Sequence, residues 1–200
     1  NFDDHFDLLK EVDWIIEVVV ERLDVKKRVF EHIDRVRKKG TFVSSNTSGI
    51  SIEKMAEGRS DDFKAHFLGT HFFNPPRYLK LLELIPTKDT KQEVLTYMKQ
   101  FAENVLGKGV VVAKDTPNFI GNRIGTYGLL ATVKEMEKSG LTFSEVDELT
   151  GPLIGRPKSA TFRTLDVVGL DTFIHVANNV KDQVEGEERA LRSEERRVGK

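Results

Sequence analysis

The residues best suited to chemistry in this chain are a histidine and a glutamate, His71 and Glu83, in the segment THFFNPPRYLKLLE. A carboxylate that accepts a hydrogen bond from one imidazole nitrogen leaves the other nitrogen as a base. It also stabilises the imidazolium that forms when this base takes a proton. The pair could also form a structural hydrogen bond within a hairpin, and the spacing alone favours this structural interpretation.

The Pro-Pro dipeptide between the histidine and the glutamate predicts how the chain brings them together. Proline cannot donate a hydrogen bond to a β-ladder, so the turn falls there and strands are predicted at 67–73 and 78–85. In a hairpin centred on Arg77, positions 71 and 83 are equidistant from the centre and lie opposite each other. Directly opposed Cβ atoms are about 4.5–5.5 Å apart, which is within reach of a hydrogen bond between the two side chains.

The composition excludes several classes of function. The chain has 200 residues, a net charge of −1 and 32% charged residues, so it has no general attraction for nucleic acid or anionic membrane. It contains no cysteine, which excludes disulfides, a thiolate nucleophile and cysteine-ligated zinc, and no metal site is predicted. No apolar run approaches the length of a membrane span or a signal peptide core. We therefore expect a soluble, cytoplasmic protein.

The arrangement of elements predicts an α/β sheet followed by helices. Strands alternate with helices over residues 1–115, which is typical of a sheet with helices on its faces. Residues 116–185 carry helical patterns only, and residues 186–200 form a highly charged tail, either solvated or not native to the fold. The expected strands are 13–20, 41–45 and 109–113 besides the hairpin, and the expected helices are 24–39, 51–57, 90–106, 117–139, 142–149, 161–165 and 171–184.

Five segments, taken in order, carry a resemblance to a known family. HFFNP followed by KLLE resembles the active-site signature of the L-3-hydroxyacyl-CoA dehydrogenase family. The other four segments span most of the chain up to Asp171, and five matches in the same order are far more specific than any one of them. These four are VVVERLDVKKRVF at 18–30, SNTSGI at 45–50, KDTPNFIGNR at 114–123 and TLDVVGLDT at 164–172.

The resemblance implies a fold and a reaction. The fold is an incomplete Rossmann-like NAD-binding domain followed by an all-α C-terminal domain. The reaction is the NAD-dependent oxidation of (S)-3-hydroxyacyl-CoA to 3-oxoacyl-CoA in fatty acid β-oxidation. By the same resemblance His71 is the base and Glu83 orients it, Ser48 hydrogen-bonds the substrate oxygen, and Asn122 reaches the substrate carbonyl.

The resemblance also implies residues that bind the NAD cofactor. Glu21 and Lys26 match a pair at the nicotinamide-side ribose, and Asn74 and Ser48 match polar residues near the nicotinamide. Each has a structural alternative. Glu21 and Lys26 could be a solvated pair at a helix start, Asn74 a turn-forming residue, and Ser48 a turn or cap residue.

Two departures from the family pattern shape what we expect of the whole protein. No GxGxxG loop occurs in residues 1–200, so the resemblance implies a fragment without its first βαβ unit, inactive and poorly soluble when expressed alone. The RPKSATFRT stretch resembles the dehydrogenase part of enzymes fused to enoyl-CoA hydratase. The implied partners are an acyl-CoA thioester and either a second copy of the chain or an enoyl-CoA hydratase. An inactive fragment or a non-catalytic, crystallin-like relative is the alternative.

Overall fold

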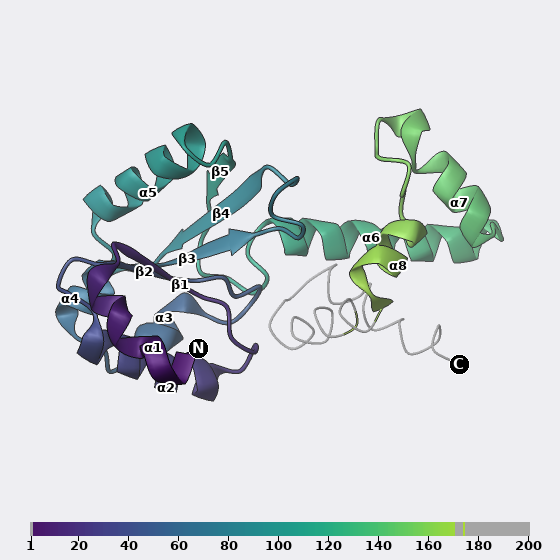
Figure 1. Cartoon of the computed structure of the whole chain (residues 1–200). Coiled ribbons are helices and arrows are strands. Elements are labelled where there is room, and N and C mark those ends of the chain that lie inside the picture. Colours follow the sequence, from purple (N-terminus) through teal and green to yellow (C-terminus); the bar gives the residue numbers. More distant parts are fainter. Residues whose placement is uncertain (1, 171–173, 175–200) are drawn as a thin grey trace. The chain divides into compact units, whose positions relative to one another are not determined.

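The computed structural model describes residues 2–170 and residue 174, and the chain divides into two compact units (Figure 1). Unit 1 runs to Phe119 and unit 2 begins at Ile120. Among the described helices, none is both long enough and apolar enough to cross a bilayer.

Unit 1 is built on a five-stranded sheet in the order β1-β2-β3-β4-β5. The first three strands are parallel, β4 runs antiparallel to β3, and β5 runs parallel to β4. The carboxyl ends of the first three strands therefore lie at one edge of the sheet, beside the start of β4. The strands are β1 (Trp14–Glu17), β2 (Phe42–Ser45), β3 (Phe67–Phe72), β4 (Leu81–Pro86) and β5 (Gly109–Val112).

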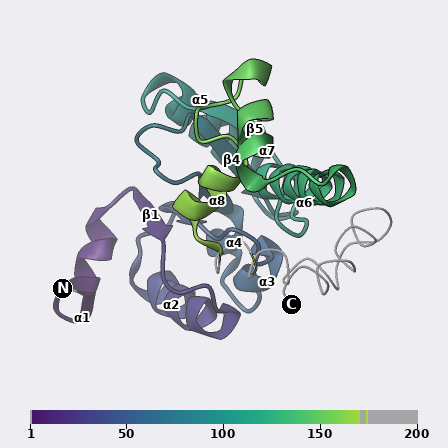
Figure 2. The ribbon, with the colours of Figure 1, turned by 90° about the vertical axis from the view of Figure 1, so that its right-hand side faces the viewer.

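Helices cover both faces of this sheet, with α5 on one side and α2, α3 and α4 on the other (Figures 1 and 2). Two apolar clusters fill the two interfaces. One joins Phe30, Ile52 and Phe67, and the other joins Leu84 to Met98. The helices of this unit are α1 (Phe2–His5), η1 (Phe6–Glu11), α2 (Leu23–Val36), α3 (Ile52–Ala56), α4 (Asp61–Ala65) and α5 (Gln92–Asn104).

Unit 2 is helical throughout its described part. Its second helix carries a complete capping box, because the Thr142 side chain accepts from the Glu145 N–H while the Glu145 carboxylate accepts from the Thr142 N–H. Asp147 is buried and accepts hydrogen bonds from three successive backbone N–H groups, those of Thr161, Phe162 and Arg163, at the start of α8. The elements are α6 (Gly121–Ser139), α7 (Phe143–Leu149), η2 (Pro152–Ile154) and α8 (Phe162–Val168).

The predicted fold class is confirmed, since an α/β sheet domain is followed by helices. Several boundaries were wrong. Strand β1 ends at Glu17, and Pro117 precedes the first helix of unit 2 because the chain turns through Thr116 to Phe119 before α6 begins. Helix α4 was missed, although Ser60 caps it. The helix expected at 171–184 and the tail lie outside the described residues except for residue 174.

Candidate active site

The histidine and the glutamate meet as the hairpin register predicts. His71 pairs with Glu83 across the antiparallel strands β3 and β4. His71 Nδ1 lies 2.6 Å from Glu83 Oε2, and both residues are buried. Because a carboxylate can only accept, Nδ1 is the donor, and Nε2 of the neutral ring is left as the acceptor. The described part of the chain provides no hydrogen bond to Nε2, so this nitrogen keeps its lone pair.

Aromatic rings surround the imidazole. The Phe73 ring centroid lies 4.5 Å from that of His71, and the Phe119 centroid lies 5.7 Å from it. Only 4% of the His71 side chain is exposed, and none of the Glu83 side chain is. The hydrogen bond therefore lies in a low-dielectric setting, where it is stronger than it would be in water.

The loop after β2 fastens the end of the histidine strand. Asn46 Oδ1 accepts a hydrogen bond from the Phe72 backbone N–H at 2.9 Å, directly after His71 in the chain. Asn46 itself continues the β1–β2 ladder, since its N–H donates to the Glu17 carbonyl at 2.9 Å. The carboxyl ends of three parallel strands are thus joined at the edge that carries the histidine, where open α/β sheets bind ligands.

A second buried cluster lies at the end of β1. The Lys26 ammonium donates to Glu17 Oε1 at 2.8 Å and Oε2 at 3.1 Å, and the two side chains are 1% and 0% exposed. Ser45 Oγ donates to Glu17 Oε2 at 2.6 Å, and the Val19 N–H donates to Glu17 Oε1 at 2.6 Å. Lys26 is therefore no solvated residue at a helix start, and that interpretation was wrong.

Glu21 links this cluster to the loop that carries Ser48. Its carboxylate accepts from Thr47 Oγ1 and from the Ser48 N–H, and it lies 3.2 Å from the Lys26 ammonium. Burial by itself would raise the pKa of Glu21, but the Thr47 hydrogen bond, the Lys26 charge and the Ser48 N–H together hold that pKa below 4.5. Glu21 is thus an ionised carboxylate with 32% of its side chain exposed.

The remaining two predicted site residues are Asn74 and Asn122. Asn74 follows β3 in the exposed Pro-Pro turn, and its peptide bond to Pro75 is cis. Asn122 is a half-buried residue in the first turn of α6 and belongs to unit 2. The structure therefore brings His71 to Glu83 and Glu21 to Lys26 and Ser48.

Sequence reasoning missed three residues that shape the site. Glu17 interrupts an apolar run, WIIEVVV, and an acid expected to be buried needs a cation, which would have pointed to Lys26. Asn46 and Thr47 stand inside the SNTS segment directly after a strand, where polar side chains commonly reach a ligand or a neighbouring strand end.

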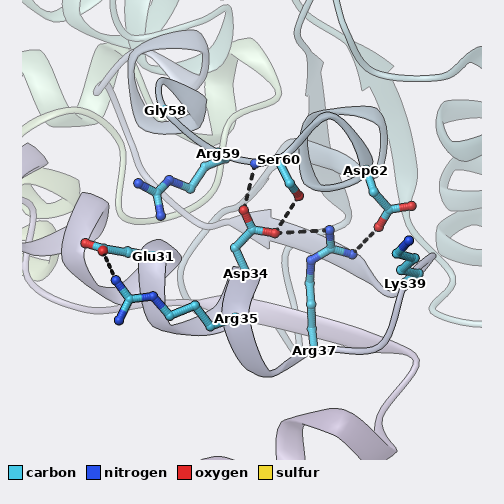
Figure 3. Close-up of a pocket in the computed structure, with 9 residues that line it drawn as sticks. All are labelled: Glu31, Asp34, Arg35, Arg37, Lys39, Gly58, Arg59, Ser60 and Asp62. Carbon is cyan, nitrogen blue, oxygen red and sulfur yellow. Dashed lines mark hydrogen bonds and ion pairs between the residues drawn. The ribbon is translucent and has the colours of Figure 1, made fainter.

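A charged pocket elsewhere in unit 1 contains none of the predicted site residues (Figure 3). Asp34 accepts from the Ser60 N–H and Oγ, both at 2.7 Å, and Arg37 bridges Asp34 and Asp62. These contacts fasten the end of α2 to the start of α4. We assign no chemistry to this pocket. It is lined by Glu31, Asp34, Arg35, Arg37, Lys39, Gly58, Arg59, Ser60 and Asp62. Within the described residues, no group of His, Asp and Glu side chains is placed to hold a metal ion.

The fold and the site define a class of protein: a Rossmann-like α/β domain with a buried, carboxylate-oriented histidine at the edge where the carboxyl ends of its parallel strands meet. Comparison with known families narrows this class. The family model described as 3-hydroxyacyl-CoA dehydrogenase, NAD binding domain, matches residues 1–116, and the model for the C-terminal domain of the same dehydrogenase matches residues 119–198. The chain belongs to the 3-hydroxyacyl-CoA dehydrogenase family.

Individual relatives agree with this assignment. The chain is 71% identical over 96% of its length to a probable 3-hydroxyacyl-CoA dehydrogenase of Bacillus subtilis (strain 168), of which it covers 24%. It is 33% identical over 90% of its length to a putative fatty acid oxidation complex trifunctional enzyme of Rickettsia prowazekii (strain Madrid E), of which it covers 25%. The chain thus spans about a quarter of the length of these two relatives.

A solved structure shares the fold. The crystal structure of (S)-3-hydroxybutyryl-CoA dehydrogenase PaaH1 from Ralstonia eutropha superimposes with a TM-score of 0.83 at 28% identity. The match covers 97% of this chain and 68% of that one.

Proposed function

We propose that this chain is the catalytic part of an NAD-dependent 3-hydroxyacyl-CoA dehydrogenase, which oxidises (S)-3-hydroxyacyl-CoA to 3-oxoacyl-CoA in fatty acid β-oxidation. One observation carries the proposal: the buried hydrogen bond of 2.6 Å between His71 Nδ1 and Glu83 Oε2. Family membership indicates which reaction to expect. The hydrogen bond orients His71 as the general base that this reaction requires.

In this proposal the chain's own residues handle the proton. His71 Nε2 accepts the proton of the 3-hydroxyl group, and Glu83 stabilises the imidazolium that results. Ser48 and Asn122 polarise the substrate oxygen. Bound NAD would supply the acceptor for the hydride that leaves the carbon bearing this hydroxyl group, so that the loss of a proton and a hydride turns the alcohol into a ketone.

The residues present fit the nicotinamide end of the cofactor. Glu21 is ionised and one third exposed at the carboxyl edge of the parallel strands, and a carboxylate is the usual acceptor for ribose hydroxyls. We propose that Glu21 binds the hydroxyl groups of this ribose and that the Lys26 ammonium holds the Glu21 carboxylate in place. Asn74 and Ser48 lie near the nicotinamide in this proposal. Residues 1–200 hold no GxGxxG loop for the pyrophosphate.

The proposal extends to domains and partners. We assign residues 1–115 to the NAD-binding domain and 116–185 to the C-terminal domain, with 186–200 as a charged tail. The substrate is an acyl-CoA thioester, and the protein acts in the cytoplasm, as a homodimer or joined to an enoyl-CoA hydratase. The trifunctional relative supports the joined arrangement, and the two family models support a domain division close to residue 117.

The test uses two polypeptides, residues 1–200 and the longest natural open reading frame that contains them. Each is assayed with acetoacetyl-CoA and NADH, the reverse reaction, and titrated with NADH by calorimetry. We expect turnover and NADH binding in the longer polypeptide and neither in the shorter one, because the pyrophosphate lacks its glycine loop there. Absence of turnover in both would overturn the dehydrogenase proposal. Turnover in residues 1–200 would show that a glycine loop is dispensable.

A further inference from the structure

The strongest unexplained feature near the site is the ring of Phe119. This residue is 2% exposed, and its ring centroid lies 5.7 Å from that of His71 with the two planes at 57°. Phe119 is the last residue of unit 1, far from His71 in the chain. Family membership and the proposed reaction give it no role.

The backbone that presents this ring is strained. Asn118 has φ 58° and Phe119 has φ 50°, in the left-handed region that a bulky residue such as phenylalanine rarely adopts. Both residues are buried. Such conformations persist only where the surrounding contacts hold them, and they cluster at functional sites.

Asp115 anchors the start of the segment that leads to these two residues. Its carboxylate accepts hydrogen bonds from Ser51 Oγ at 2.8 Å, the Ile52 N–H at 3.0 Å and the Glu53 N–H at 2.9 Å. Helix α3 already has its own cap, because Ser51 Oγ accepts from the Lys54 N–H. Asp115 therefore does more than cap a short helix: it fastens the segment that leads to Phe119 onto the start of α3.

The same segment is fixed at two further points. The Ala113 N–H donates to the Leu84 carbonyl at 2.9 Å, which continues the ladder next to the Glu83 position. Asn118 Oδ1 lies 2.8 Å from where a Cβ on Gly49 would stand, so the loop that carries Ser48 packs against Asn118 without room for a side chain. Residues 113–119 thus touch the glutamate strand, the serine loop and the histidine ring.

We propose that Phe119 is a positioning residue for His71, that its ring shields the His71–Glu83 hydrogen bond from water, and that Asp115 holds it in place. Without the ring, water would reach the imidazole and compete for the Nδ1–H donor, which weakens the orientation of the base. This inference deepens the proposed function and rests on it for its catalytic meaning. The shielding itself can be measured without turnover.

The experiment measures the solvent-exchange rate of the His71 Nδ1 proton by NMR. The sample is the longest natural polypeptide that contains this chain, labelled with ¹⁵N-histidine, and His71→Gln assigns the signal. We expect Phe119→Ala to accelerate exchange about tenfold or more, because local access of water sets the rate. Phe119→Leu, which keeps most of the volume, should stay within about threefold of the wild type. Asp115→Asn should accelerate exchange less than Phe119→Ala does.

A matched control separates shielding from general destabilisation. Phe63 is a fully buried phenylalanine of the same apolar cluster, and its ring contacts are with Phe30, Phe67 and Arg37. Phe63→Ala should leave the His71 proton at its wild-type rate. Amide exchange of residues 81–86, followed by mass spectrometry, reports whether strand β4 remains folded in every variant.

Two results would overturn the inference. One is a Phe119→Ala exchange rate within about twofold of the wild type while β4 stays protected. The other is an equal acceleration in Phe63→Ala. If Phe119→Ala unfolds β4, the Asp115→Asn variant provides the test instead. An unchanged exchange rate of the His71 Nδ1 proton in that variant refutes the role of Asp115. Turnover with acetoacetyl-CoA is measured on the same samples. If the exchange rates are as expected but the samples show no turnover, the proposed function is refuted and the shielding by Phe119 still stands.

Discussion

Two buried pairs at the same edge of the sheet, Glu17–Lys26 and His71–Glu83, differ in how fully their hydrogen-bonding groups are used. In the Glu17–Lys26 pair, Glu17 accepts from Lys26, Ser45 and Val19. The Lys26 ammonium in turn faces two carboxylates and a backbone carbonyl. In the other pair, His71 donates to Glu83 through Nδ1, and its second nitrogen makes no hydrogen bond within the described part of the chain.

The difference teaches which buried ionisable group can react. A group whose donors and acceptors are all used cannot take a proton without breaking contacts, and burial makes such a break expensive. A group with one fixed nitrogen and one spare nitrogen can exchange a proton while it stays oriented. We therefore expect substitutions in the first pair to change mainly stability and substitutions in the second pair to change mainly turnover.

The largest effect should come from His71→Gln in the longest natural polypeptide that contains this chain. Removal of a general base lowers kcat by about 10²–10⁴-fold, and glutamine can still donate a hydrogen bond to Glu83. Steady-state assays with acetoacetyl-CoA and NADH measure the loss, and urea unfolding checks the fold. Near-wild-type turnover would remove His71 from the mechanism.

Lys26→Met breaks the Glu17–Lys26 pair and tests whether this pair contributes mainly to stability. It leaves the buried Glu17 carboxylate without its cation, which should lower the free energy of unfolding by about 3–5 kcal/mol. Urea denaturation measures the loss. The double variant Lys26→Met/Glu17→Leu should recover most of it, because no uncompensated charge remains. A single variant as stable as the wild type would show that the pair is not structural.

Asn122→Ala tests whether unit 2 contributes to substrate handling. We expect the acyl-CoA KM to rise or kcat to fall by about tenfold, the worth of one hydrogen bond, while the NADH affinity stays unchanged. Steady-state kinetics with the acyl-CoA substrate and NADH calorimetry, both on the same variant, separate an effect on the substrate from an effect on the cofactor. Loss of NADH binding with normal acyl-CoA kinetics would contradict this assignment of Asn122.

The smallest effect concerns the pH dependence of stability at Glu21. Its pKa is lowered in the folded chain below 4.5, so the ionised carboxylate stabilises the fold above that pH. This contribution is lost as the pH falls through the folded pKa. Unfolding curves should therefore show a stability difference between the wild type and Glu21→Gln that is constant above about pH 6 and shrinks below the ordinary Glu pKa. A difference that grows on acidification would reverse the sign of the shift.

The sequence could predict the parts of the site that depend on local patterns. The His71–Glu83 pairing follows from strand periodicity and a Pro-Pro turn, both of which act over a few residues, and the structure confirms it. Ser51 and Thr142 cap α3 and α7 through their side chains, and a serine or threonine directly before a helix is a local signal of this kind.

Other features depend on contacts between distant residues, which no local pattern specifies. Lys26 reads as one of a solvated pair at a helix start, yet its ammonium is buried on the carboxylate of Glu17, nine residues earlier. Pro117 reads as the start of a helix, yet the chain turns there, with the Phe119 N–H donating to the Thr116 carbonyl, and α6 begins only at Gly121. The Phe119 contact with His71 joins two residues far apart in the chain, and it carries no signal in the sequence.

The most direct test of the central claim is a double-mutant cycle on kcat with His71→Gln, Glu83→Gln and the combined variant. If Glu83 acts only by orienting and charge-stabilising His71, the combined variant should be no slower than His71→Gln, within about threefold. Glu83→Gln alone should lower kcat with an intact fold. If the two losses instead multiply in the combined variant, the residues act independently, and the account of His71 and Glu83 as one general-base unit is contradicted.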